Sequence, residues 1–165
     1  MNKSSRDFPY RHKESIVSAI SAGVFFVVVG AIFVTTPDLF DKIIAFFRDL
    51  DIVRVPNTEI LLPAPVSPGD HPVLYSAVAQ FGFIWSLYQL VILALRFAIG
   101  SPLNKKAETL SNVVFWFGTS YLIRTFLGES ISATTWFAFW SAVIILVGVS
   151  LLARAAIFAV ARALQ

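Results

Sequence analysis

Apolar residues run in four long stretches along the chain, over residues 16–34, 73–99, 107–127 and 131–153. An α-helix rises about 1.5 Å per residue, so about 20 residues cross the roughly 30 Å hydrocarbon core of a bilayer. Each stretch reaches that length, and none shows the alternation of a strand in a membrane barrel. The pattern therefore predicts four transmembrane helices.

Residues 37–72, between the first two stretches, follow a different pattern. Apolar positions over residues 39–50 form a broad helical face opposite polar ones, which is typical of a helix lying in the membrane interface. We expect Thr36 to cap this helix, with Pro37 at its first position. Residues 51–62 then form two β-leaning runs around a Pro-Asn turn signal, which predicts an extended segment or a β-hairpin.

The composition agrees with a lipid environment. Apolar residues make up 57% of the chain and charged residues 14%, compared with about 25% charged in ordinary globular chains. A chain of 165 residues is too short to bury so much apolar surface in an interior of its own. We therefore interpret residues 1–165 as one all-α integral membrane domain, a four-helix transmembrane bundle with an extracytoplasmic interfacial helix and an extended or β-hairpin loop.

Charged residues gather at the ends of the stretches, and only Arg96, Glu108 and Arg124 lie within one. Lys and Arg dominate the N-terminal segment, the turn after the second stretch and the C-terminal tail, whereas Asp and Glu outnumber them in residues 37–72. The positive-inside rule then predicts a multi-pass protein of the cell membrane with both termini cytoplasmic. A cleaved signal peptide is the alternative for residues 16–34, but that stretch exceeds the usual length.

Several kinds of chemistry are disfavoured by the residue types themselves. The chain has no cysteine and only two histidines, and the predicted topology separates His12 from His71 across the membrane, which disfavours thiolate, haem and two-histidine metal sites. Metalloprotease, hydrolase, P-loop and dinucleotide motifs are absent. A net charge of +3 located at helix ends does not indicate nucleic-acid binding. We expect no cofactor, no metal and no catalytic residue, and a solvated His71.

Polar residues within the second and third stretches form a candidate polar stripe. The short turn at residues 100–106 predicts an antiparallel pair of helices, and a rotation of 100° per residue groups the polar positions of each helix on one face. Such groups mark a substrate or ion route, or they bond helices together. We favour bonding, because the charged members lie near helix ends. The stripe consists of Gln89, Arg96, Asn112, Trp116, Ser120 and Arg124.

The connection over residues 37–72 is longer than is usual between packed helices, and long patterned connections often carry a function. One interpretation is a cap that closes the outer end of the bundle. The other is a candidate external partner surface formed by Ile52, Arg54, Glu59 and Leu61.

Three classes of function agree with these features. The sequence favours a non-catalytic accessory or scaffold subunit of a membrane complex, whose partners are the lipid bilayer and either other membrane subunits or further copies of the chain. A small oligomeric channel or transporter is the alternative, because the stripe offers polar groups at membrane depth. An enzyme that acts on a lipid or a quinone is the weakest of the three.

Overall fold

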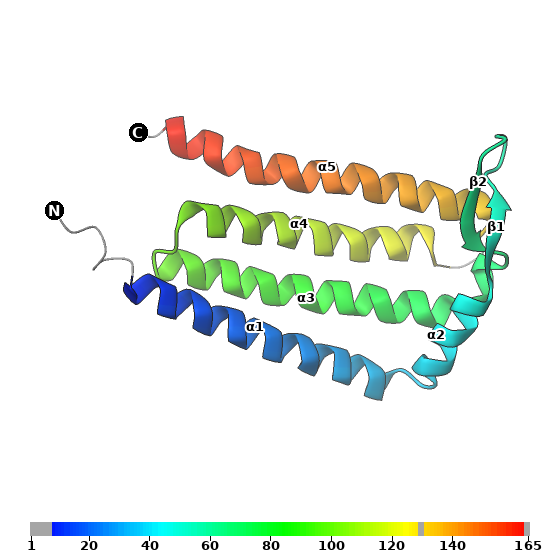
Figure 1. Ribbon diagram of the computed structural model, residues 1–165, viewed down its shortest axis with the longest axis horizontal. Helices are drawn as coiled ribbons and strands as arrows, with labels where there is room; N and C mark the ends of the chain where they lie inside the picture. Colours follow the sequence, from blue (N-terminus) through cyan, green and yellow to red (C-terminus); the bar gives the residue numbers. More distant parts are fainter. Residues whose placement is uncertain (1–7, 129–130, 164–165) are drawn as a thin grey trace.

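A computed structural model describes residues 8–128 and 131–163. Four long helices lie side by side in one layer, in the order α1, α3, α4, α5 (Figure 1). They are α1 (Phe8–Thr35), α3 (Pro72–Ala98), α4 (Leu103–Phe126) and α5 (Ala133–Ala163). All four predicted stretches are helical, and α1 and α5 extend well beyond the apolar residues that predicted them.

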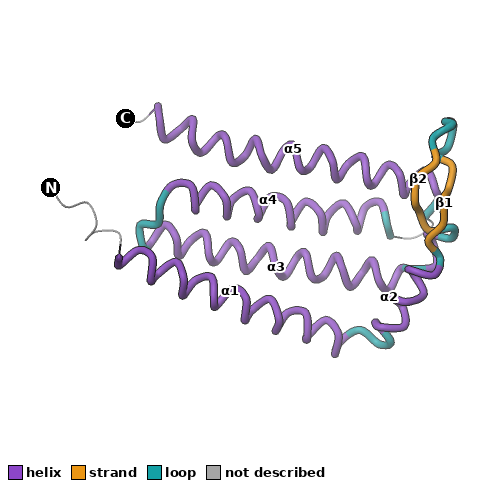
Figure 2. Tube along the Cα trace, viewed as in Figure 1, coloured by secondary structure: helices purple, strands orange, loops and turns teal. Residues whose placement is uncertain are grey.

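The connection between α1 and α3 folds over one end of the layer (Figure 2). It contains α2 (Leu39–Arg48), β1 (Leu50–Arg54), β2 (Leu61–Pro65) and the 3-10 turn η1 (Pro68–Asp70). Of the two predicted alternatives, an extended segment or a hairpin, the structure shows the hairpin. The predicted start of α2 is wrong. Asp38, with a φ of 53°, precedes the helix instead of Thr36 and Pro37, because Asp tolerates the left-handed turn that redirects the chain after α1.

The register of the hairpin explains how β2 accommodates two prolines. Backbone hydrogen bonds join Val55 to Ile60 and Val66 to Asp49, at the two ends of the antiparallel pairing. Hydrogen-bonded pairs alternate with non-hydrogen-bonded ones, so residues 63 and 65 occupy positions whose nitrogen faces away from β1. Proline at these positions removes no bond of the ladder and leaves the outer edge of β2 poor in donors.

A tight turn joins α3 to α4. Gly100 has a φ of 70°, and the amide of Ser101 donates to the carbonyl oxygen of Arg96 at 2.9 Å. This is the glycine-terminated helix end in which a left-handed residue satisfies the last carbonyl groups. Pro102 then precedes α4, so the chain reverses within a few residues, as the sequence predicts.

Helices α3 and α4 approach closely around Gly82. A Cβ atom added there would lie 3.3 Å from the carbonyl oxygen of Trp116. Nearby, the hydroxyl of Ser120 donates a hydrogen bond of 2.7 Å to the carbonyl oxygen of Ala79. A small residue and a short hydroxyl thus allow the two helix backbones to come together.

In the described part of the chain, three helical segments are long and apolar enough to cross a membrane, namely Ser15–Thr35, Pro72–Ala98 and Ala133–Val160. Helix α4 is less apolar than these three, and it has a neighbour on each side (Figure 1). Its polar side chains bond to both neighbours. Ser120 donates to Ala79 in α3, as described above, and Ser111 donates to the carbonyl oxygen of Ser150 in α5 at 2.9 Å. The polar side chains of α4 are therefore bonded within the protein, to the helix on either side.

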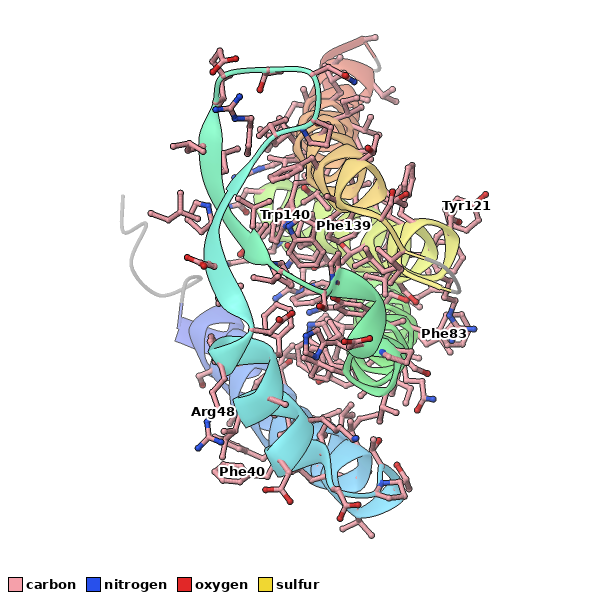
Figure 3. All side chains as sticks on the ribbon, turned by 90° about the vertical axis from the view of Figure 1, so that its right-hand side faces the viewer. Phe40, Arg48, Phe83, Tyr121, Phe139 and Trp140 are labelled. Carbon is pink, nitrogen blue, oxygen red and sulfur yellow. The ribbon has the colours of Figure 1, made fainter. Side chains whose placement is uncertain are left out.

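The layer is open at both edges. Helix α1 packs mainly on α3 and α5 mainly on α4, so the four helices do not close into the compact bundle that the sequence suggested. The accessible surface is 10,879 Å², against about 8,100 Å² for a soluble monomer of this mass. Figure 3 shows the layer end-on as a curve, with α2 and the hairpin over its concave side.

Candidate functional site

The end of the layer that α2 and the hairpin cover contains a hydrogen-bonded pair of side chains, His71 and Asp49. Nε2 of His71 lies 3.0 Å from Oδ2 of Asp49, and the side chains are 7% and 22% exposed. The amide of Ser67 donates to the same carboxylate oxygen at 3.0 Å. Asp49 therefore ties the end of α2 to the turn before η1 and to the start of α3.

The hydrogen bond from His71 holds the pKa of Asp49 below its ordinary value of 3.8, and the Ser67 amide acts in the same direction against the effect of burial. An ionised carboxylate accepts hydrogen bonds only, so Nε2 of His71 carries the donated proton. The expectation of a solvated His71 is wrong. Its partner lies 22 positions away along the chain, and sequence spacing does not reveal such a contact.

Aromatic rings surround this pair. The ring of Phe46 lies 5.2 Å from that of His71 and 6.1 Å from that of Trp136, at the start of α5. Tyr75 of α3 lies 6.1 Å from Trp136. Edge and tilted ring contacts of this kind favour a fixed arrangement of rings. The cluster therefore joins α2, α3 and α5 beneath the hairpin.

The four residues of the candidate external partner surface lie together. Antiparallel pairing places Arg54 opposite Leu61 and Ile52 opposite residue 63, so Ile52, Arg54 and Leu61 share one face of the hairpin. Ile52 is 67% exposed and Leu61 59% exposed. Arg54 and Glu59 form an exposed ion pair of 3.3 Å beside them.

The opposite face of the hairpin packs against the helices. Val53 and Ala64 belong to the same apolar cluster as Trp136 and Phe139, and Ala64 is almost fully buried. Because side chains alternate between the two faces of a strand, this packing directs Ile52 and Leu61 outward. The hairpin thus presents apolar side chains on a supported surface.

The candidate polar stripe divides between different surroundings. Arg96 donates to the carbonyl oxygen of Lys105 at 2.8 Å and to the hydroxyl of Thr109, which links the end of α3 to the start of α4. Ser120 makes the bond to α3 described above. Gln89 and Asn112 are half-buried.

The two remaining members of the stripe lie apart. Trp116 is half-buried and lines two apolar cavities on the concave side. Arg124 is exposed and lies 5.9 Å from the ring of Phe83. It lines a partly polar cavity of about 410 Å³ with Ser76 and Gln80. The stripe is therefore not one continuous polar face.

Among residues 8–128 and 131–163, no group of three His, Asp or Glu side chains is arranged to hold a metal ion.

Neither families of known proteins, nor curated proteins, nor solved structures match this chain.

Proposed function

We propose that this chain is a non-catalytic, multi-pass membrane protein that serves as an accessory or scaffold subunit of a membrane complex. In this proposal all four long helices cross the membrane, the termini are cytoplasmic, and α2 and the hairpin lie outside. The outward face of the hairpin, formed by Ile52, Arg54, Glu59 and Leu61, meets the partner.

The observation that carries the proposal is the exposure of Ile52 and Leu61 on a braced strand pair. A single exposed apolar residue is ordinary, but apolar residues grouped on one supported face favour an interface. The Asp49–His71 pair and the packing of Val53 fix the hairpin on the helices. A fixed surface loses little conformational entropy when a partner binds.

Support for α4 as a fourth span comes from its position between α3 and α5 and from its bonds to both. Polar side chains that bond within the protein are less costly in a membrane than those facing lipid. Lys105 and Lys106 lie in the first turn of α4, and Arg154 lies in the last third of α5. The start of α4 and the end of α5 lie at the end of the layer opposite the hairpin (Figure 1). The positive charge of these residues favours a cytoplasmic location for that end.

The test is extraction of the tagged chain from native membranes in a mild detergent, with mass spectrometry of the proteins that co-purify. Replacing Ile52 and Leu61 together by Ser removes two apolar anchors worth about 1.5–3 kcal/mol each when buried. We expect at least a tenfold loss of a stoichiometric partner, an estimate from that energy range.

The matched control is Ile60→Ser. Ile60 is 57% exposed and immediately precedes β2 on the opposite face, so the partner should remain. Equal recovery with both variants would show that the partner does not use this surface.

Recovery of further copies of this chain alone would favour the channel alternative, which the cavity beside Arg124 supports. Flux into vesicles, with Gln89→Leu and Arg124→Leu as controls, then decides between them.

A further inference from the structure

An apolar groove of about 460 Å³ runs along the concave side of the layer, between α3, α4 and α5. Phe46 and Phe47 of α2 close it at the end covered by the hairpin. Figure 3 shows Phe139 and Trp140, which line the groove, between the helices and the hairpin, whereas Tyr121 and Phe83 lie on the other side of the layer. The volume falls within the range of about 300–1,000 Å³ typical of ligand sites.

Three residues that line this apolar groove carry polar atoms without a partner. Within the described residues, Oη of Tyr75, Oγ1 of Thr119 and Nε1 of Trp136 are buried and make no hydrogen bond. Tyr75 and Trp136 are only 5% and 6% exposed. Leaving a polar group buried and unpaired is costly. Their presence around one groove indicates that a bound molecule supplies the missing partner.

The chemistry of Tyr75 and Trp136 restricts that molecule. The indole nitrogen donates only and the phenol hydroxyl donates readily, so the ligand must offer an acceptor oxygen. The carboxylate of Asp49 lies just beyond His71, whose ring is 6.3 Å from that of Tyr75. A nearby negative charge disfavours an anionic ligand group. A neutral carbonyl attached to a long apolar chain fits both conditions.

The position of the two donors along the helices identifies a source of such carbonyls. Tyr75 and Trp136 are each the fourth residue of their helix. Helix α3 has 27 residues and is about 40 Å long, longer than the hydrocarbon core of about 30 Å. Its first turn therefore lies where the acyl chains meet the headgroups, which is also the depth that Tyr and Trp favour. Ester carbonyls of bilayer lipids lie at this boundary.

We propose that the groove is a binding site for an ester-linked lipid, with an acyl chain along α3, α4 and α5. An ester carbonyl accepts hydrogen bonds from Tyr75 and Trp136 beneath the hairpin. The surface of the groove is apolar, so the side chains of Tyr75 and Trp136 turn their polar atoms toward the ester carbonyl when the lipid binds. The site rests on the membrane location proposed above but not on the hairpin's partner, and Thr119 lies too deep to contact the same carbonyl.

The test uses the full chain in detergent with two probes, dioleoylphosphatidylcholine and its dialkyl ether analogue with the same hydrocarbon chains, and native mass spectrometry to count retained lipid. The ether analogue lacks only the carbonyls. We expect the wild-type chain to retain the ester lipid about fivefold to tenfold more than the ether, which corresponds to one or two net hydrogen bonds. Tyr75→Phe and Trp136→Phe should each remove most of this preference.

Tyr121→Phe is the matched control, because it makes the same substitution on an exposed side chain outside the groove. It should retain the ester preference. Thermal unfolding gives a second measurement. If the Tyr75 hydroxyl has no ligand, Tyr75→Phe removes an unsatisfied group and raises Tm with either lipid. If the ester binds it, Tyr75→Phe lowers Tm only in the ester lipid.

Equal retention of ester and ether lipids, or a Tyr75→Phe variant that retains lipid like the wild type, would overturn the site. Displacement of the ester lipid by an equal concentration of ubiquinone would also overturn it, because a quinone would then be the better occupant. Recovery of the chain in the carbonate-soluble fraction of cells would instead contradict the membrane proposal itself. Failure of the lipid site and failure of the proposed function are therefore distinguishable.

Discussion

At the scale of single residues, Asp49 accepts hydrogen bonds from three other residues at the end of the layer that α2 and the hairpin cover. Its carboxylate accepts from His71 and from the Ser67 amide, and its backbone carbonyl accepts from Val66 at 2.9 Å. Asp49, the first residue after α2, thus holds both the segment that follows the hairpin and the start of α3. Hydrogen bonds to a charged group contribute more than those to a neutral group.

We predict that Asp49→Asn lowers the stability of the covered end by about 1–3 kcal/mol at pH 7. Because folding lowers the pKa of Asp49, its ionised form stabilises the fold above the unfolded pKa of about 3.9. That contribution declines as the pH falls from about 5 through the folded pKa. The measurement is the protection of the Ser67 amide from hydrogen exchange, relative to an unprotected amide at the same pH, from pH 6 to pH 3. This protection should fall in the wild type and depend less on pH in the variant.

Asp70→Asn is the control for this prediction. Asp70 is the sequence neighbour of His71 but is exposed, so its replacement should leave the exchange of Ser67 unchanged. A wild-type profile with no dependence between pH 5 and pH 3 would contradict the role assigned to Asp49.

Individual contacts of this kind were beyond prediction from the sequence. Asp70 is next to His71 in the sequence, whereas the fold brings Asp49 to His71 through the path of the hairpin. The same holds for Tyr75 and Trp136, whose adjacency depends on where α5 lies relative to α3. Residues far apart along the chain meet only through tertiary packing, and a helical wheel describes one helix at a time.

At the scale of elements, the sequence predicted more, because length and periodicity are local properties. Four apolar stretches gave four helices, and the Pro-Asn turn signal gave a hairpin. The polar stripe was predicted less well, because its residues on α4 lie in different surroundings. Ser120 faces α3, Trp116 faces the concave side and Arg124 faces the surface, because the neighbours of α4 lie on two sides of it and not on one.

The close approach of α3 and α4 at Gly82 yields a prediction at this scale. Gly82→Val places side-chain atoms against the carbonyl of Trp116, a backbone atom that cannot move without shifting α4. We expect a loss of about 1–3 kcal/mol from overpacking, measured as a lower Tm of the detergent-solubilised protein. Gly23→Val is the matched control, since a Cβ atom there meets nothing within 4 Å. A Gly82→Val variant as stable as Gly23→Val would show that the two helices can separate freely.

At the scale of the whole molecule, the open layer explains why so many apolar side chains are exposed. Phe26 on α1, Val34 near its end and Leu152 on α5 are 71%, 87% and 71% exposed, on helices that have one neighbour each in the layer. Water would make this exposure costly, whereas lipid chains or other subunits would cover it. The overall shape therefore agrees with a component that completes its packing in a membrane.

The four-span topology can be tested with single introduced cysteines, because the chain has no cysteine of its own. Single cysteines at Asn104, in the first turn of α4, and at Thr134, at the start of α5, lie at opposite ends of the layer. If α4 crosses the membrane, a membrane-impermeant maleimide added outside intact cells labels Thr134→Cys, and Asn104→Cys reacts only after the cells are opened. Asp70→Cys, at the same end as Thr134, should behave like Thr134→Cys. If Asn104→Cys and Thr134→Cys react from the same side, α4 does not span, and its polar side chains then mark a helix held against the membrane by α3 and α5.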